Sequence, residues 1–176
     1  MSSISIAALL LYTGCQSFDI EYINETLPVF SLLDVNTTSE LYDTSVSSDQ
    51  FASTSPELVS AWYFGHSTWG YCSGQFGHLN TLQDTLNEEG QAIQIIGVNG
   101  IGYENGNERV TEDRDIPWLQ DIEDIDAWTQ WGVQYRDVYV LDQNGNLRFI
   151  YNLTVNNVGE PDNLELLKEA MIGLIE

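Results

Sequence analysis

The sequence from Leu58 to Leu82 is LVSAWYFGHSTWGYCSGQFGHLNTL. It opens with an apolar and aromatic run, Leu58–Phe64, which is short enough to be a buried strand. A polar break follows at Gly65–Thr68. Apolar residues then recur at helical spacing, at Phe76, Leu79, Leu82 and Leu86. These patterns predict a strand, a tight turn and a helix that packs by one face.

Cys72 falls in the first turn of this predicted helix. Backbone N–H groups at a helix start have no partner within the helix, and the helix dipole places partial positive charge there. A thiol in that position ionises more readily, and the thiolate is the nucleophilic form. A structural interpretation stands beside this one, because a free cysteine commonly packs as a small, inert hydrophobic residue. Cys72 is therefore a candidate reactive thiol.

The segment Trp69-Gly70-Tyr71-Cys72, placed between a strand and a helix, resembles a thioredoxin-type Cys-x-x-Cys turn with Trp69 in the place of the first cysteine. More specifically, the chain resembles the thioredoxin-like amino-terminal domain of selenoprotein P, in which a selenocysteine-x-x-cysteine turn follows a hydrophobic strand. The resemblance spans roughly residues 55–175. Its further landmarks occur in the same order: Gln75, Leu79, Ile95–Asn99, Ile116-Pro117, the Trp128 region and Tyr139–Gly145.

The resemblance implies a thioredoxin-like α/β domain over residues 27–176, with a central mixed sheet and helices on both faces. The remaining patterns agree with that order of elements. They predict a buried strand at Ala92–Asn99, a short helix at Ala127–Trp131 before Gly132, a hairpin of Val138–Asp142 with Leu147–Tyr151, and a last helix that starts near Pro161.

Three further segments belong to this domain. Leu27–Asn36 is similar to the first strand of extracytoplasmic redoxins and is predicted to be an edge strand after Pro28. Thr37–Ser55 is predicted to be a polar loop with room for one hairpin strand, and Gly100–Asp115 to be a loop. Thioredoxins place a cis-proline before the third core strand, facing the active cysteine. In this chain that position is near Arg136-Asp137, without a proline, as in selenoprotein P.

Three functional interpretations follow, because Trp69 as written cannot attack a substrate. In the first, residue 69 is naturally selenocysteine, whose codon some translation tables read as tryptophan. The protein would then be a thiol or selenol oxidoreductase that acts on disulfides or peroxides. Residue 69 would attack the substrate, and Cys72 would resolve the intermediate. In the second, Cys72 works alone, beside Gln75, His66 and His78, although His78 is predicted to be a surface residue. In the third, the domain is a redox-inactive binding module. The first two place Gly70, Tyr71 and Gln75 around the active-site turn.

The amino-terminal residues predict a place in the cell envelope. The apolar run Ile4–Tyr12 has the length of a secretory segment and is too short to span a bilayer. Leu11–Cys15 resembles a bacterial lipoprotein box, although Tyr12 stands where leucine is usual. The resemblance implies a signal segment at 1–15, lipidation of Cys15 and a tether at 16–26. The alternative is a buried amino-terminal strand with an ordinary cysteine.

Composition excludes several classes of function. The 176 residues include 27 acidic and five basic side chains, a formal charge of −22, which disfavours nucleic acid and anionic membrane surfaces as partners. Two distant cysteines and two histidines lack zinc spacing, so neither a metal nor a cofactor is expected. Asp121, Glu123, Asp124 and Asp126 lack the pattern of a calcium loop and are predicted to form a solvated acidic face.

Overall fold

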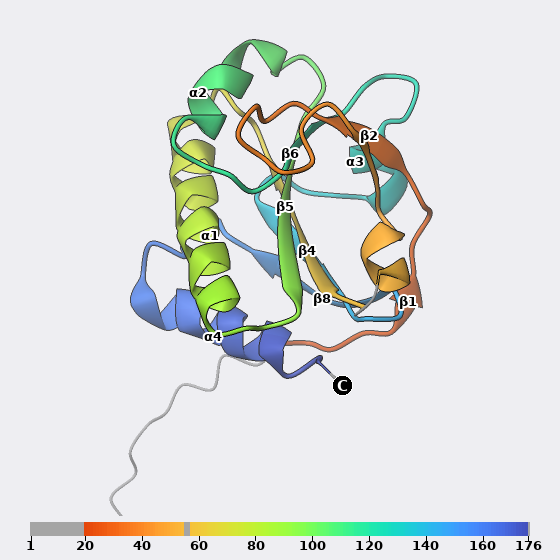
Figure 1. The fold of residues 1–176 in the computed structure, drawn as a ribbon, viewed down its shortest axis with the longest axis vertical. Helices are drawn as coiled ribbons and strands as arrows, with labels where there is room; N and C mark the ends of the chain where they lie inside the picture. Colours follow the sequence, from red (N-terminus) through yellow and green to blue (C-terminus); the bar gives the residue numbers. More distant parts are fainter. Residues whose placement is uncertain (1–19, 55–56, 176) are drawn as a thin grey trace, which may run out of the picture.

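A computed structural model of the chain describes residues 20–54 and 57–175 (Figure 1). The predicted signal segment, its lipidation point Cys15 and the first part of the predicted tether therefore lie outside the described residues. In the described part, eight strands form one sheet in the order β1-β8-β7-β4-β5-β6-β2-β3. The strands are β1 (Glu25–Thr26), β2 (Ser31–Asp34), β3 (Ser45–Ser47), β4 (Val59–Gly65), β5 (Ile93–Asn99), β6 (Trp118–Gln120), β7 (Asp137–Leu141) and β8 (Asn146–Asn152).

The centre of the sheet is mixed, as predicted. β4 pairs with β5 in parallel and with β7 antiparallel. All seven residues of β4 are buried, which explains why the strand reads as a continuous apolar run with no alternation. Its side chains pack into two hydrophobic cores on opposite faces of the sheet, with Ala61 and Tyr63 in one core and Trp62 and Phe64 in the other.

Helices cover both faces of this sheet. One core receives side chains from α1 (Gly70–Glu88), α2 (Asn107–Thr111) and α4 (Pro161–Ile172). The other receives them from α3 (Ala127–Trp131) and the 3-10 helix η1 (Gln50–Ser53). Figure 1 shows α1 and α3 on opposite sides of the central strands. The predicted arrangement of a mixed sheet between helices is confirmed.

Helix ends follow the local chemistry of the sequence. α1 presents the predicted residues Phe76, Leu79, Leu82 and Leu86 to the core. It ends one residue before the cap Glu89, and Gly90 then takes a φ of 69°, a left-handed conformation that favours glycine. Gly132 ends α3 in the same way with a φ of 66°, and α4 begins at Pro161.

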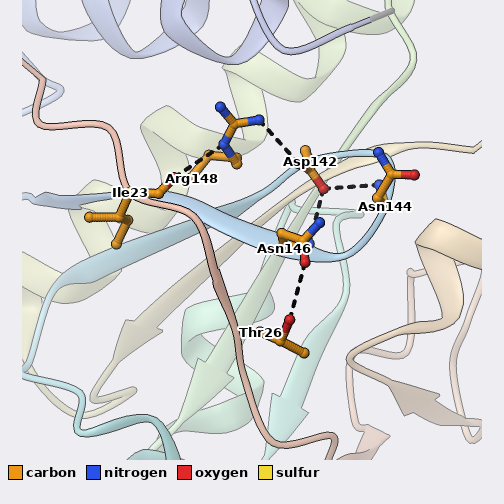
Figure 2. A network of polar contacts seen from close by, with 6 residues as sticks. All are labelled: Ile23, Thr26, Asp142, Asn144, Asn146 and Arg148. Atoms are coloured by element: carbon orange, nitrogen blue, oxygen red, sulfur yellow. Dashed lines mark hydrogen bonds and ion pairs between the residues drawn. The ribbon is translucent and has the colours of Figure 1, made fainter.

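The predicted hairpin is present, and Asp142 holds its turn together (Figure 2). The carboxylate Oδ1 of Asp142 accepts hydrogen bonds from the backbone N–H groups of Asn144, at 2.9 Å, and Asn146, at 3.0 Å. Its Oδ2 forms an ion pair with Arg148, whose Nε donates to the carbonyl of Ile23. This arrangement attaches the chain before β1 to β8, so residues 23–26 of the predicted tether lie against the sheet.

Two expectations for the connections are wrong, one is confirmed, and one strand was missed. β2 is not an edge strand, because β3 pairs with it on one side and β6 on the other. β3 lies in the segment that was expected to hold one hairpin strand, and it forms that hairpin. The segment Gly100–Asp115 was predicted to be a loop, but it contains the 3-10 helix η2 (Glu104–Gly106) and α2. β6 was missed, since a strand of three residues after a proline carries almost no periodic pattern.

Asp121 also departs from its prediction as part of a solvated acidic face. Its side chain is buried, and its Oδ1 accepts hydrogen bonds from the N–H groups of Ile122 and Ala127, at 2.9 and 3.1 Å. The carboxylate therefore caps the segment that leads into α3. Glu123 and Asp124 are exposed, as predicted. No group of residues suited to holding a metal ion occurs within 20–54 and 57–175.

Gly97 of β5 sets how closely α1 packs on the sheet. A Cβ added to Gly97 would lie 2.1 Å from Cε3 of Trp118 and 2.7 Å from Cε2 of Phe76. The rings of Phe76 and Trp118 are themselves in contact, with centroids 4.6 Å apart. Because Phe76 belongs to the second turn of α1, the space at Gly97 determines where the start of that helix lies.

Gly97→Ala should therefore lower the free energy of unfolding by about 1–3 kcal/mol, since an inserted methyl group forces well-packed rings apart. Gly74→Ala is the matched control, because Gly74 is exposed on α1 and an added Cβ there meets nothing within 4 Å. It should raise the free energy of unfolding by about 0.5–1 kcal/mol through helix propensity. Urea denaturation measures both, and a neutral Gly97→Ala would contradict the packing argument.

Candidate active site

The turn between β4 and α1 carries the candidate residues in the predicted geometry. Trp69 caps α1 with extended backbone angles, φ −93° and ψ 117°, and the helix starts at Gly70. Its carbonyl accepts a hydrogen bond from the N–H of Ser73, at 3.0 Å. Cys72 is the third residue of the helix, so its predicted place in the first turn is confirmed.

Exposure differs sharply across this turn. Trp69 is 39% exposed and Tyr71 42% exposed, whereas Cys72 has 0% of its surface exposed. An alanine-type Cβ at Gly70 would meet nothing within 4 Å, so the surface of the turn is open between the two aromatic side chains. The thiol of Cys72 lies below that surface, and the residue's backbone carbonyl accepts a hydrogen bond from the hydroxyl of Tyr63, at 3.1 Å.

Gln75 is held by the segment before α4. Its Nε2 donates to Oδ1 of Asn157, at 2.7 Å, and its Oε1 accepts from the N–H of Val158, at 3.0 Å. The side chain is buried, and both ends of its amide have partners. Gln75 therefore connects α1 with this segment, and its amide is occupied by structural contacts. His78 is exposed, as predicted.

His66, in the turn itself, is enclosed by aromatic rings. It stacks on Tyr103 with ring centroids 3.9 Å apart and on Trp128 at 5.0 Å, while Trp69 meets it edge-on at 4.6 Å. Burial lowers the pKa of His66, and the positive charge of Arg136 lowers it further. The imidazole is therefore neutral at pH 7 and forms part of the support for Trp69.

Arg136 faces the turn from the position where thioredoxins have the cis-proline. Its guanidinium lies over the ring of Tyr71 at 4.4 Å, over Tyr135 at 5.0 Å and over Trp69 at 6.0 Å. The comparison with thioredoxins put the position opposite the turn near residues 136–137, and of these two it is Arg136 whose side chain contacts the turn. The role of the arginine itself was missed.

A polar network fixes the residues that lead into the turn. Oδ1 of Asn99, at the end of β5, accepts from the N–H of Ser67 at 3.0 Å, and its Nδ2 donates to Oε1 of Gln120 at 2.9 Å. Arg109 of α2 donates to the carbonyls of Ser67, at 3.2 Å, and Thr68, at 2.9 Å. The backbone before Trp69 is thus held from two neighbouring elements.

No local pattern in the sequence could have identified these contacts, because the basic residues that make them are distant from the turn along the chain. The chain has only five basic residues, and three of them touch residues 67–73: Arg109, Arg114, which donates to Ser73, and Arg136. Their concentration around one turn of an acidic protein marks that turn as a functional candidate. Within the described residues, no helix is both long and apolar enough to cross a membrane.

No protein-family model matches the chain, and no curated protein matches its sequence. Several solved structures resemble it over nearly their whole length, among them the following three. The thioredoxin domain of a thiol-disulfide oxidoreductase from Bacteroides vulgatus has a TM-score of 0.63 at 13% identity, covering 88% of this chain and 99% of that one. Peroxidoxin BcpB from Mycobacterium tuberculosis has a TM-score of 0.63 at 15% identity, covering 88% and 98%.

A SCO1/SenC family lipoprotein from Bacillus anthracis also has a TM-score of 0.63, at 17% identity, covering 89% of this chain and 98% of that one. Identities this low relate the chains by architecture, and the architecture agrees with the mixed sheet and the two helical layers described above. The chain therefore has the thioredoxin-like α/β fold.

Proposed function

We propose that the chain is a thiol or selenol oxidoreductase that acts on disulfides or peroxides, with residue 69 in the attacking position and Cys72 as the resolving thiol. The observation that carries the proposal is the contrast in exposure, 39% at residue 69 against 0% at Cys72. In Cys-x-x-Cys enzymes the first residue is exposed and attacks, and the second is buried and resolves the mixed disulfide. Two of the similar structures are described as an oxidoreductase and a peroxidoxin.

The reaction balances with a selenolate or thiolate at position 69. That group attacks one sulfur of a substrate disulfide, a bond forms to this sulfur, and the other sulfur leaves as a thiolate. The thiolate of Cys72 then attacks residue 69 and releases the second substrate thiolate. The substrate gains two electrons, and the protein is left with an internal bond between positions 69 and 72, which a dithiol reductant reopens.

Selenocysteine at position 69 is the form of this proposal that the resemblance to selenoprotein P supports. Tryptophan cannot supply the attacking atom, and the position matches the selenocysteine of the resembled turn. The codon for residue 69, together with the mass of the natural protein, tests this point. A selenium-containing peptide spanning residues 65–75 is the expected result, and a tryptophan-containing one would remove the selenol version.

Burial weighs against Cys72 acting alone. A thiol with no exposed surface cannot meet a peroxide or a disulfide in this conformation, and the amide of Gln75 already has two partners. The polar neighbours available to a lone thiol are therefore fewer than the sequence suggested. His66 is enclosed by Tyr103 and Trp128, and His78 is exposed on the helix.

The packing of Trp69 favours a second candidate, a redox-inactive binding module. Its ring meets His66 at 4.6 Å and Tyr135 at 5.7 Å, so a genuine tryptophan has contacts to make at this site. In such a module the exposed aromatic side chains would bind a partner, and Cys72 would be a packing residue. Restoring a thiol at position 69 distinguishes the two candidates.

Trp69→Cys, made in a Cys15→Ser background, should create an internal disulfide with Cys72 on mild oxidation, because the first helical turn brings the two side chains within reach. The oxidised protein should titrate with no free thiol and the reduced protein with two. The variant should reduce insulin faster than the unsubstituted protein. Cys72→Ser in the same variant should abolish the internal disulfide and leave mixed disulfides unresolved.

Tyr71→Cys is the matched control, since Tyr71 is equally exposed but adjacent to Cys72, where a disulfide is strained. It should keep two free thiols and gain no activity. If Trp69→Cys forms no disulfide and no faster insulin reduction is measured, the binding module is the better account. The lost ring contacts would then appear only as a decrease of about 1–3 kcal/mol in the free energy of unfolding.

We further propose that the domain is held at the outside of a bacterial membrane by a lipid on Cys15. The lipoprotein-like segment Leu11–Cys15 supports this, as does the description of the similar B. anthracis structure as a lipoprotein. Expressed with its own leader in a bacterium, the protein should partition into the detergent phase, and Cys15→Ser should move it to the aqueous phase. Full-length protein that stays aqueous in both cases would exclude the anchor.

A further inference from the structure

Among the residues that the structure describes, Arg136 has no ionic partner, although the protein is strongly acidic. Within residues 20–54 and 57–175 the two ion pairs are Arg148 with Asp142 and Lys168 with Glu89. The carboxylate next to Arg136 in the sequence, Asp137, is engaged elsewhere: it accepts from Nδ2 of Asn152 at 2.7 Å and from the N–H of Gln134 at 2.9 Å. In the described part of the chain, no carboxylate therefore forms an ion pair with Arg136.

The sheet holds Arg136 in place through its backbone. Its N–H donates to the carbonyl of Phe64 at 2.7 Å, and its own carbonyl accepts from Leu153 at 2.8 Å. Its φ of 72° lies in the left-handed region that a non-glycine residue rarely adopts. These contacts direct the side chain across the turn, where it lies over the rings of Trp69, Tyr71 and Tyr135.

The guanidinium of Arg136 has N–H donors that make no hydrogen bond within the described residues. Among the described residues, Nη1 donates to Oγ1 of Thr154 at 3.3 Å, and Nε is buried with no partner. A guanidinium carries five N–H groups in a planar fork that matches the two oxygens of a carboxylate. The three surrounding rings, each between 39% and 46% exposed, offer apolar surface for the carbon atoms of the same ligand. The field of this charge is felt in the turn, because it contributes to the lowered pKa of His66.

We propose that Arg136, with the exposed rings of Trp69, Tyr71 and Tyr135, is the subsite that selects the substrate of this turn, and that the substrate is a small disulfide carrying a carboxylate close to its sulfur atoms. This inference rests on the proposed function, since it names the substrate class of the same site. The carboxylate binds the guanidinium, and the adjacent sulfur is then presented to residue 69. No new redox step is added: the disulfide accepts two electrons, as described above.

The test uses three aliphatic disulfides of similar size that differ in charge: 3,3′-dithiodipropionate, bis(2-hydroxyethyl) disulfide and cystamine, which are anionic, neutral and cationic. Each is reacted with the reduced Trp69→Cys variant at fixed ionic strength, and each rate is divided by the rate with dithiothreitol to remove intrinsic reactivity. The normalised rate should be about tenfold higher for the anion than for the cation, the size expected for one charged hydrogen-bonded contact.

Arg136→Gln, added to that variant, should bring the ratio close to one, and Arg136→Lys should keep part of the preference because it keeps the charge. Lys168→Gln is the control: it also removes one positive charge, but beyond the far end of α1, a helix of 19 residues or about 28 Å. Its ratio should be unchanged. If Arg136→Gln slows all three disulfides equally, the arginine acts on the attacking thiol, and the proposed selectivity is wrong.

A binding measurement on the unsubstituted protein keeps the two proposals separable. Titration with 3,3′-dithiodipropionate should shift the NMR signals of the Trp69 indole N–H and the Arg136 Nε–H in a saturable way, and Arg136→Gln should abolish the Trp69 shift. The absence of any shift would overturn the carboxylate subsite. Saturable binding combined with an unreactive Trp69→Cys variant would instead overturn the oxidoreductase and leave the subsite standing.

Discussion

The backbone of β4 is hydrogen bonded along both edges, to β5 in parallel and to β7 antiparallel, and this constraint places everything that follows it. Because the strand is held on two sides and buried on both faces, its end at Gly65 fixes where the short turn that leads into α1 begins. The last carbonyls of β4 hold residues around the site. The carbonyl of Phe64 accepts a hydrogen bond from the N–H of Arg136, and that of Gly65 accepts one from the N–H of Gly100. Trp69 and its surroundings are thus positioned by the core of the sheet.

Local patterns were sufficient to predict the elements that form this frame. Each of these patterns determines structure only within a few residues of its own position. They are the apolar run of β4, the periodic residues of α1, the glycines that end helices at Gly90 and Gly132, and the turn around Gly145. The position of Cys72 in the first helical turn could be predicted for the same reason. So could the exposure of Trp69, which follows from its place at the cap of a helix.

The features that were missed depend on contacts between distant parts of the chain. β2 became an internal strand because β3 pairs with it, and nothing in Leu27–Asn36 itself reveals that partner. Asp121 was predicted to belong to an acidic surface, but its buried carboxylate accepts hydrogen bonds from three backbone N–H groups in the next seven residues. Arg136 is 67 positions from Trp69 in the sequence, and only the register of β4 with β7 brings them together.

The two ends of the sheet have a consequence for how copies of the protein meet. Within residues 20–54 and 57–175, the outermost strands, β1 and β3, contain two and three residues, so the sheet described there ends on either side in very little free backbone. A long exposed edge strand offers backbone hydrogen-bonding groups to which another chain can add a strand, whereas a short edge strand offers few. With a charge of −22 spread over each molecule, neighbouring copies also repel one another. We therefore expect the folded protein to resist aggregation at high concentration.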